Sequence, residues 1–107
     1  MIMTVDISNS NVVFAVMEDA KVLSSVRVLS DRQRPADEYA ALVGWGFQQR
    51  GYDLREIEGA IIASVVPSLT QSIREAVEQV TGRVPFVIGP GVKTGLNIRL
   101  EDPTELG

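Results

Sequence analysis

The 107-residue sequence contains no cysteine and no histidine. The lack of cysteine excludes a disulfide framework and a thiolate metal site. The lack of histidine removes the commonest general base, the usual zinc ligand and every histidine-dependent catalytic triad. Any catalysis by these residues must therefore use carboxylates, lysine, hydroxyl groups or the backbone.

Long hydrophobic runs and an excess of basic residues are also missing. The longest apolar run, Ala60 to Val66, is interrupted by Ser64 and is far short of the roughly 20 residues that a spanning helix needs. No signal peptide is visible, so we expect a cytoplasmic protein without membrane contact. The 10 basic and 14 acidic residues give a net charge of −4 and leave no basic footprint for nucleic acid.

What is present is the composition of an ordinary globular domain. Apolar residues make up 45% of the chain and charged residues 22%, which argues against disorder. The length suits one folded unit, so we expect residues 1–107 to form a single domain.

The N-terminal third of the sequence predicts three strands joined by short turns. Apolar runs lie at Ile2–Val5 and Val12–Met17. In the third segment, Lys21–Leu29, apolar and polar residues alternate, which is typical of a strand. The polar segments Ser8–Asn11 and Glu18–Ala20 are typical of turns. Connections this short predict an antiparallel meander.

Beyond these strands the apolar period becomes helical. The predicted helix begins at Pro35 and ends before Gly51, with an apolar face made of Tyr39, Leu42, Val43 and Phe47. Gly44 and Gly46 weaken this helix unless they allow close packing on a sheet.

The remaining pattern predicts a strand, a helix and a second, parallel strand. The run Ala60–Val66 is typical of a strand that is buried on both faces. Ser68 and Gln71 predict a capping box for a helix that closes at Gly82. That helix has an apolar stripe at Leu69, Ile73, Ala76, Val77 and Val80. A strand at Pro85–Ile88 completes a right-handed βαβ unit.

The combined order is βββαβαβ, which predicts an α/β fold with a mixed five-stranded sheet and helices. This order resembles the ribonuclease-H-like lobe of the actin-like ATPase superfamily, and residues 1–107 would be its N-terminal lobe. Element order alone indicates a fold and no function.

The first candidate site is the segment Asp6-Ile7-Ser8-Asn9-Ser10-Asn11. A carboxylate at the end of a first strand can bind Mg²⁺, directly or through water. The hydroxyl and backbone N–H groups of the following turn can face phosphate oxygens. Taken alone, the segment fits a plain β-hairpin turn better, because hairpins use the same residue types.

The second candidate is the glycine-rich loop Gly89-Pro90-Gly91-Val92-Lys93-Thr94-Gly95. It is not a Walker A loop, because Val92 rather than glycine precedes Lys93 and the four-residue spacer between glycines is missing. Two interpretations stay open. One is a tight loop with a solvated lysine, and the other is a loop that brings the backbone close to a small anionic ligand.

A third segment carries arginines near the start of the first helix. Arg27, Arg32 and Arg34 are close enough in sequence to form a small basic patch. A solvated helix entrance is the better interpretation, because the patch is offset by the nearby acidic residues Asp31, Asp37 and Glu38.

Four segments carry longer motifs. Asp6–Ser10 reads Asp-Ile-Ser-Asn-Ser, Asp31–Tyr39 reads Asp-Arg-Gln-Arg-Pro-Ala-Asp-Glu-Tyr, and Ala63–Pro67 reads Ala-Ser-Val-Val-Pro. Gly89–Arg99 reads Gly-Pro-Gly-Val-Lys-Thr-Gly-Leu-Asn-Ile-Arg. In the same order these are similar to motifs of the type III pantothenate kinase family: Asp-x-Gly-Asn-Thr, Asp-Arg-x-Arg-Thr-x-Asp-Glu-Tyr, Ser-Ser-Val-Val-Pro, and the last string throughout.

This resemblance implies an ATP-dependent kinase that phosphorylates the primary hydroxyl of pantothenate, the first step of coenzyme A synthesis. Asp6 would hold Mg²⁺, and the ATP phosphates would lie against Asp6, Ile7, Ser8, Asn9, Ser10, Asn11, Val12 and Val13. Pantothenate would lie against Gly89, Pro90, Gly91, Val92, Lys93, Thr94, Gly95, Leu100 and Gly107. The mechanism would be positioning plus electrostatic stabilisation, with a carboxylate taking the hydroxyl proton.

Two residues differ from the family's pattern, and a third, the last residue of the sequence, lies at the start of a family motif. Ser8 replaces a glycine, and its Cβ would obstruct close approach of a phosphate or force an unfavourable φ. Leu100 replaces a tyrosine that contacts pantothenate. Gly107 aligns with the first residue of the family's Gly-Ala-Asp-Arg, so the catalytic Asp, the second lobe and its potassium site would follow it. We therefore expect this chain alone to be inactive, with no catalytic residue of its own.

An alternative interpretation is a stand-alone, non-catalytic module of the same family that binds a nucleotide or a partner. The changes at Ser8 and Leu100 favour it, because both fall at ligand-contact positions. A first lobe without the second lobe would expose the apolar surface that normally faces it. We therefore also expect self-association, as a homodimer.

Overall fold

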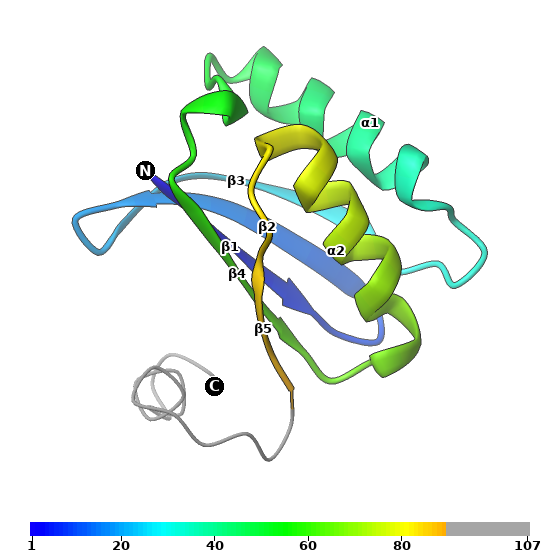
Figure 1. Cartoon of the computed structure of the whole chain (residues 1–107). Helices are drawn as coiled ribbons and strands as arrows, with labels where there is room; N and C mark the ends of the chain where they lie inside the picture. Colours follow the sequence, from blue (N-terminus) through cyan, green and yellow to red (C-terminus); the bar gives the residue numbers. More distant parts are fainter. Residues whose placement is uncertain (90–107) are drawn as a thin grey trace.

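The sheet and its helices follow the predicted order. The computed structural model describes residues 1–89, and within them the elements are β1 (Ile2–Ile7), β2 (Asn11–Glu18), β3 (Lys21–Leu29), α1 (Ala36–Gln49), the short 3₁₀ helix η1 (Leu54–Glu56), β4 (Gly59–Ser64), α2 (Pro67–Thr81) and β5 (Phe86–Ile88) (Figure 1). The predicted βββαβαβ order is confirmed, and η1 is an addition to it.

The strands form one mixed sheet with the spatial order β3-β2-β1-β4-β5. The first three strands pair antiparallel, whereas β4 pairs parallel with both β1 and β5. In this register Ile7 lies beside Ser64, and Ala63 lies beside Ile88. Because β1, β4 and β5 run in the same direction, their carboxyl ends meet at one edge of the sheet.

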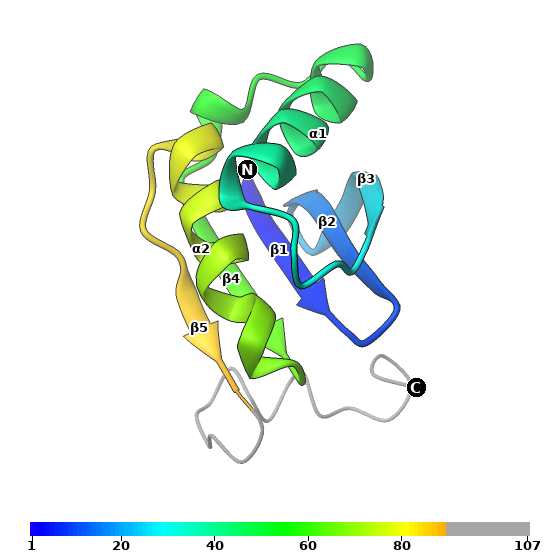
Figure 2. The same ribbon diagram turned by 90° about the vertical axis from the view of Figure 1, so that its right-hand side faces the viewer.

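Both helices cover the same face of the sheet, where they lie side by side (Figure 2). Alternate residues of the strands point to this face, including Met3 and Val5 of β1 and Phe14 of β2, and each is at most 2% exposed. The helices bury Tyr39, Val43 and Phe47 from α1 and Ile73 and Val77 from α2 against them. No helix of residues 1–89 combines the length and apolarity needed to cross a membrane.

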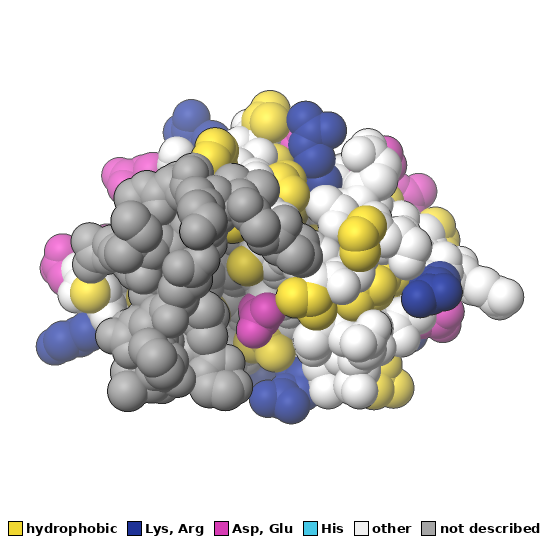
Figure 3. Space-filling view, turned by 90° about the horizontal axis from the view of Figure 1, so that it is seen from below, with side chains coloured by type: hydrophobic (Ala, Val, Ile, Leu, Met, Phe, Trp, Pro, Cys, Tyr) yellow, Lys and Arg dark blue, Asp and Glu magenta, His cyan; other side chains and the backbone are white. Residues whose placement is uncertain are grey.

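The strand predicted at Ala60–Val66 differs from expectation in burial and length. It spans Gly59–Ser64, with Ala60, Ile62 and Ser64 buried and the alternate residues only half-buried. Burial on both faces was the wrong expectation, because both helices lie on one face. In the view from below, hydrophobic side chains of the described residues lie beside an acidic one (Figure 3).

The helix ends differ from the predicted caps. Val66 is the N-cap residue of α2, Pro67 occupies the first turn and no side chain caps the helix, so the predicted capping box of Ser68 and Gln71 is wrong. The reason is that the fixed φ of proline suits the first helical position, so the helix begins at Pro67, two residues before the start that an N-cap at Ser68 would give. The C-terminal prediction is confirmed, since Gly82 closes α2 with a left-handed φ of 75°.

The apolar face of α1 is narrower than predicted. Tyr39, Val43 and Phe47, spaced by four residues, are buried, but Leu42 is 42% exposed. The inward-facing stripe packs on both β3 and α2, and this leaves Leu42 and Trp45 on the outer side of the helix. The predicted end of α1 is confirmed, because Gly51 follows the C-cap Arg50 with a φ of 84°.

The two glycines inside α1 have different surroundings. A Cβ built on Gly46 would lie 2.9 Å from Cγ2 of Val26, a contact shorter than side chains tolerate. A Cβ on Gly44 would meet only Cγ1 of Val80, at the ordinary distance of 3.8 Å. Gly46 therefore allows the predicted close packing of α1 on the sheet, whereas Gly44 does not need to be glycine.

Substitution of the two glycines, Gly44 and Gly46, gives a direct test of how α1 packs on the sheet. Gly46→Ala should lower the free energy of unfolding by about 1–3 kcal/mol through overpacking, even after its gain in helix propensity. Gly44→Ala is the matched control and should raise the same free energy by about 0.5–1 kcal/mol. Urea unfolding followed by circular dichroism measures both, and changes of the same sign in the two variants would contradict the packing described here.

Candidate functional site

The carboxyl end of β1 presents Asp6 at the centre of the sheet. Asp6 lies between Val13 of β2 and Ala63 of β4 in the register of the sheet. It alternates with Val5 and Ile7, which face the helices, so its side chain belongs to the opposite face of the sheet, and it is exposed among the described residues. Within residues 1–89 the carboxylate has no hydrogen-bond or ion-pair partner. Its oxygens are therefore available to a cation or to water.

A compact serine-rich turn follows Asp6 and leads into β2. The backbone N–H and the Oγ of Ser8 both donate to the carbonyl oxygen of Asn11, each at 3.0 Å. Among the described residues other than glycine, only Asp19 and Ala20 have a positive φ. The expectation that Ser8 is forced into an unfavourable φ is therefore wrong, because this turn closes with an ordinary backbone. The side chain of Ser8 is exposed.

The end of β3 holds this turn in place through Ser30. The Oγ of Ser30 donates to the carbonyl oxygen of Ser8 at 2.7 Å, and its backbone N–H donates to the carbonyl oxygen of Ser10 at 3.0 Å. One residue, distant in sequence, thus bonds both ends of the three-residue turn. Sequence reasoning missed Ser30, although its place directly after a predicted strand was the available signal.

The carboxyl end of β4 is fixed by a buried hydroxyl. The Oγ of Ser64 accepts from the backbone N–H of Val66 and from the Oγ1 of Thr70, both at 3.0 Å. The backbone N–H of Val65, which directly follows Ser64, donates to the carbonyl oxygen of Ile7 at 3.2 Å. These bonds tie the start of α2 to the residue that follows Asp6. The interruption of the apolar run by a serine was the sequence signal for this feature.

The structure brings part of the two predicted segments to one edge. Asp6 and the exposed residues Ser8, Asn9 and Ser10 lie at the carboxyl end of β1, and Gly89 follows the parallel strand β5. Pro90, Gly91, Val92, Lys93, Thr94, Gly95, Leu100 and Gly107 lie outside the described residues.

Not every residue of the first segment can offer its side chain to a ligand. Ile7 and Val12 are fully buried against the helices, so only their backbone groups could face one. Asn11 and Val13 are half-buried.

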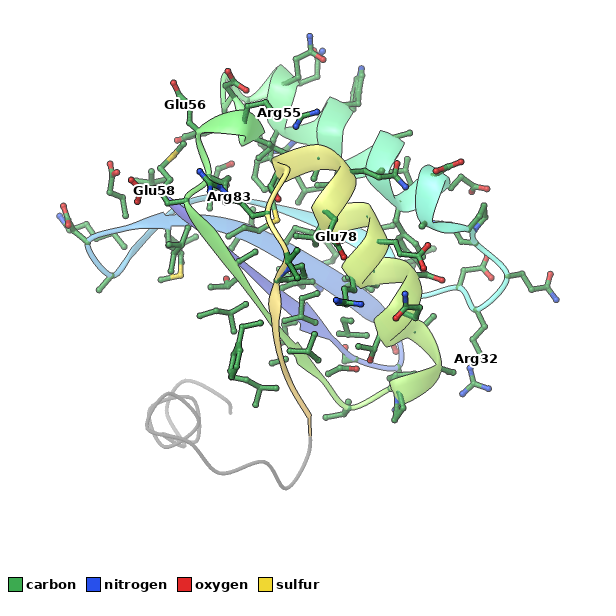
Figure 4. All side chains as sticks on the ribbon, in the orientation of Figure 1. Arg32, Arg55, Glu56, Glu58, Glu78 and Arg83 are labelled. Carbon is green, nitrogen blue, oxygen red and sulfur yellow. The ribbon has the colours of Figure 1, made fainter. Side chains whose placement is uncertain are left out.

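Elsewhere in residues 1–89, the charged groups do not form a second site of comparable chemistry. Arg55, Glu56 and Glu58 lie toward the opposite end of the molecule, where Arg83 donates from Nε to the carbonyl oxygen of Ile57 at 3.2 Å (Figure 4). A hollow of about 530 Å³ between α1, α2 and the segment after Gly51 is also remote from Asp6. Residues 1–89 contain no group of three or more potential metal ligands, so a cation at Asp6 would take its other oxygens from water or a ligand.

Comparison with known proteins supplies the family. A sequence model of type III pantothenate kinase matches residues 2–107. Proteins described as type III pantothenate kinase are 44% identical in Moorella thermoacetica and 37% identical in Exiguobacterium sibiricum, over all of this chain and 42% of each relative. The chain thus spans about two fifths of the length of these relatives.

A solved structure is similar in fold. The ROK hexokinase of Thermus thermophilus superposes with a TM-score of 0.60 at 19% identity, over 82% of this chain and 33% of the hexokinase. This likeness confirms the predicted ribonuclease-H-like, actin-like ATPase fold. The match of the family model over almost the entire sequence shows that the chain belongs to the type III pantothenate kinase family.

Proposed function

We propose that residues 1–107 form the ATP-binding lobe of an enzyme that transfers the γ-phosphoryl group of ATP to pantothenate. The observation that carries this proposal is the meeting of Asp6, the serine turn and the start of α2 at the carboxyl ends of adjacent parallel strands. Ligands of open α/β sheets bind outside the carboxyl ends of strands, where the direction of chain connection changes. Here the change occurs at β1, which has an antiparallel neighbour on one side and a parallel one on the other.

The residues at this edge fit the chemistry of a magnesium nucleotide. Mg²⁺ prefers oxygen ligands, retains several waters and is often held by one or two carboxylates together with the phosphates of the substrate. The exposed carboxylate of Asp6 meets that requirement. When bound, Mg²⁺ would neutralise charge on the transferring phosphoryl group.

The turn and the helix supply the remaining anion contacts. The hydroxyls and backbone groups of Ser8, Asn9 and Ser10 lie in the exposed turn directly after Asp6. The N-terminus of α2 opens at the same edge, and its partial positive charge favours a phosphate. Because the turn is held at both ends by Ser30, its donors would be in position before the nucleotide binds. Such positioning is the main contribution of a protein to phosphoryl transfer.

The substrate side of the proposal rests on family membership. Relatives named type III pantothenate kinase match the whole of this chain, and Gly89 begins the segment that resembles the family's pantothenate loop. Gly89 follows β5, two strands away from β1 in the same sheet. We propose that pantothenate approaches from that side, with its primary hydroxyl directed toward the phosphates at β1.

The carboxylate of Asp6 gives the first test. Asp6→Asn should weaken binding of Mg-ATP at least about tenfold, equivalent to about 1.4 kcal/mol, because an amide is a poor ligand for Mg²⁺. Isothermal titration calorimetry measures the affinity. Glu56→Gln is the matched control, since it removes the same charge from an exposed residue far from the edge and should leave binding unchanged.

The outcomes of this titration test the phosphate site that both proposed roles share. Equal affinities of Asp6→Asn and the unaltered chain, or no binding at millimolar nucleotide, would contradict the proposed phosphate site. Binding that depends on Asp6 would support the phosphate site in either role, because the kinase lobe and the non-catalytic module would both bind the nucleotide and neither is expected to phosphorylate pantothenate by itself.

Ser30 gives a second test, of positioning rather than contact. Ser30→Ala removes the hydrogen bond to the carbonyl of Ser8 and should lower the free energy of unfolding by only about 0.5–1 kcal/mol. Mg-ATP affinity should nevertheless fall, and amide exchange at Ser8 should accelerate. Ser30→Thr keeps the hydroxyl and should restore both. Ser25→Ala, on the exposed middle of β3, is the control, and an equal loss of affinity there would argue against the role of Ser30.

A further inference from the structure

A groove lies between the outer edge of β3 and the outward surface of α1, with a volume of about 440 Å³. Its apolar lining includes Leu29, Leu42 and Trp45, which are 68%, 42% and 64% exposed. Trp45 is the single tryptophan of the sequence. Large aromatic side chains left this exposed are typical of contact surfaces. The groove lies along the opposite edge of the sheet from β5, and its Arg27 pairs with Val13, which in turn pairs with Asp6.

One wall of the groove is a strand with a free edge. β3 is the outermost strand of the sheet and pairs only with β2 among the described residues. The N–H of Ser30 donates inward to Ser10, so the backbone groups of the alternate residues Leu29, Arg27 and Ser25 point outward. Within residues 1–89 these groups make no backbone hydrogen bond. An extended segment could therefore pair with this edge.

The charge of the groove indicates what kind of segment fits. Three of its lining residues are the arginines Arg27, Arg34 and Arg50, and none is acidic, although the chain carries a net charge of −4. The Nε of Arg34 is buried without a hydrogen-bond partner in the described part of the chain, and its ion pair with Oε1 of Glu38 is long, at 3.5 Å. Arg27 is exposed and has no ion pair there. These cations favour carboxylates in the occupant.

We infer that this groove binds an extended, acidic segment of another protein, which adds to β3 as a further strand of the sheet. Its alternate apolar side chains pack on Trp45 and Leu42 on the α1 side, and its carboxylates point to the other face of the added strand, where they meet Arg27. A second copy of this chain fits less well. Its β3 carries Lys21 and Arg27 and no acidic residue, so pairing of two β3 strands would bring like charges together.

The test uses the 107-residue chain and a synthetic seven-residue peptide in which valine and glutamate alternate, labelled with a fluorophore. We expect saturable binding by fluorescence anisotropy and a shift in the emission of Trp45 when unlabelled peptide is added. Arg27→Glu should weaken binding at least about tenfold. Arg74→Glu is the matched control on α2 and should bind as the unaltered chain does. Melting temperatures of both variants check that they are folded.

Two altered peptides decide whether binding uses the strand edge and the charge. Methylation of alternate backbone nitrogens of the peptide removes the donors that would face β3, and it should abolish binding. Replacement of glutamate by lysine should do the same. Equal binding of either altered peptide, or unchanged binding by Arg27→Glu, would overturn the inference. So would absence of peptide binding together with a dimer that Trp45→Ala dissociates, because the groove would then be an interface between copies.

Discussion

The parallel pairing of β4 with β1 is the constraint on which the rest of the structure depends. It places Ser64 beside Ile7 and lets the N–H of Val65 bond the carbonyl oxygen of Ile7. A parallel neighbour requires a long connection, and here the chain between β1 and β4 passes through β2, β3 and then α1, which covers the sheet. The same pairing brings the carboxyl ends of β1 and β4 to one edge, where the start of α2 then lies next to Asp6 and its turn. Fold and candidate site are thus consequences of one register.

The candidate site is held by hydrogen bonds from outside its own segment. Ser30 comes from the end of β3, and the hydroxyl of Ser64 comes from the end of β4. Ser30 holds the turn between β1 and β2, whereas Ser64 fixes the start of α2, where the N–H of Val65 bonds the carbonyl oxygen of Ile7. A phosphate-binding turn needs this rigidity, because phosphoryl transfer gains most from groups that do not have to reorganise. The ordinary backbone at Ser8 fits such a turn without strain.

Sequence patterns predicted the element order well, because local periodicity reflects how each element buries one face. The sequence patterns failed where burial or hydrogen bonding depended on which other elements pack against a segment. The burial on both faces expected for Ala60–Val66 would have required helices on both sides of the sheet. The predicted capping box at Ser68 does not form, because Pro67 occupies the first turn of the helix. Leu42 shared a helical face with buried residues but lies beyond the narrow contact with the sheet. The link between Ser30 and Ser8 joins residues distant in sequence, and only the register of three strands brings them together.

The central claim is that the edge around Asp6 holds the phosphates of a magnesium nucleotide. Amide chemical shifts of the ¹⁵N-labelled chain, recorded while Mg-ATP is added, test it most directly. The account predicts that the largest shifts fall on residues 6–13 and on the first turn of α2, with little change around η1. Shifts concentrated in the hollow between Tyr52 and Gln79, or no shifts at millimolar nucleotide, would contradict it.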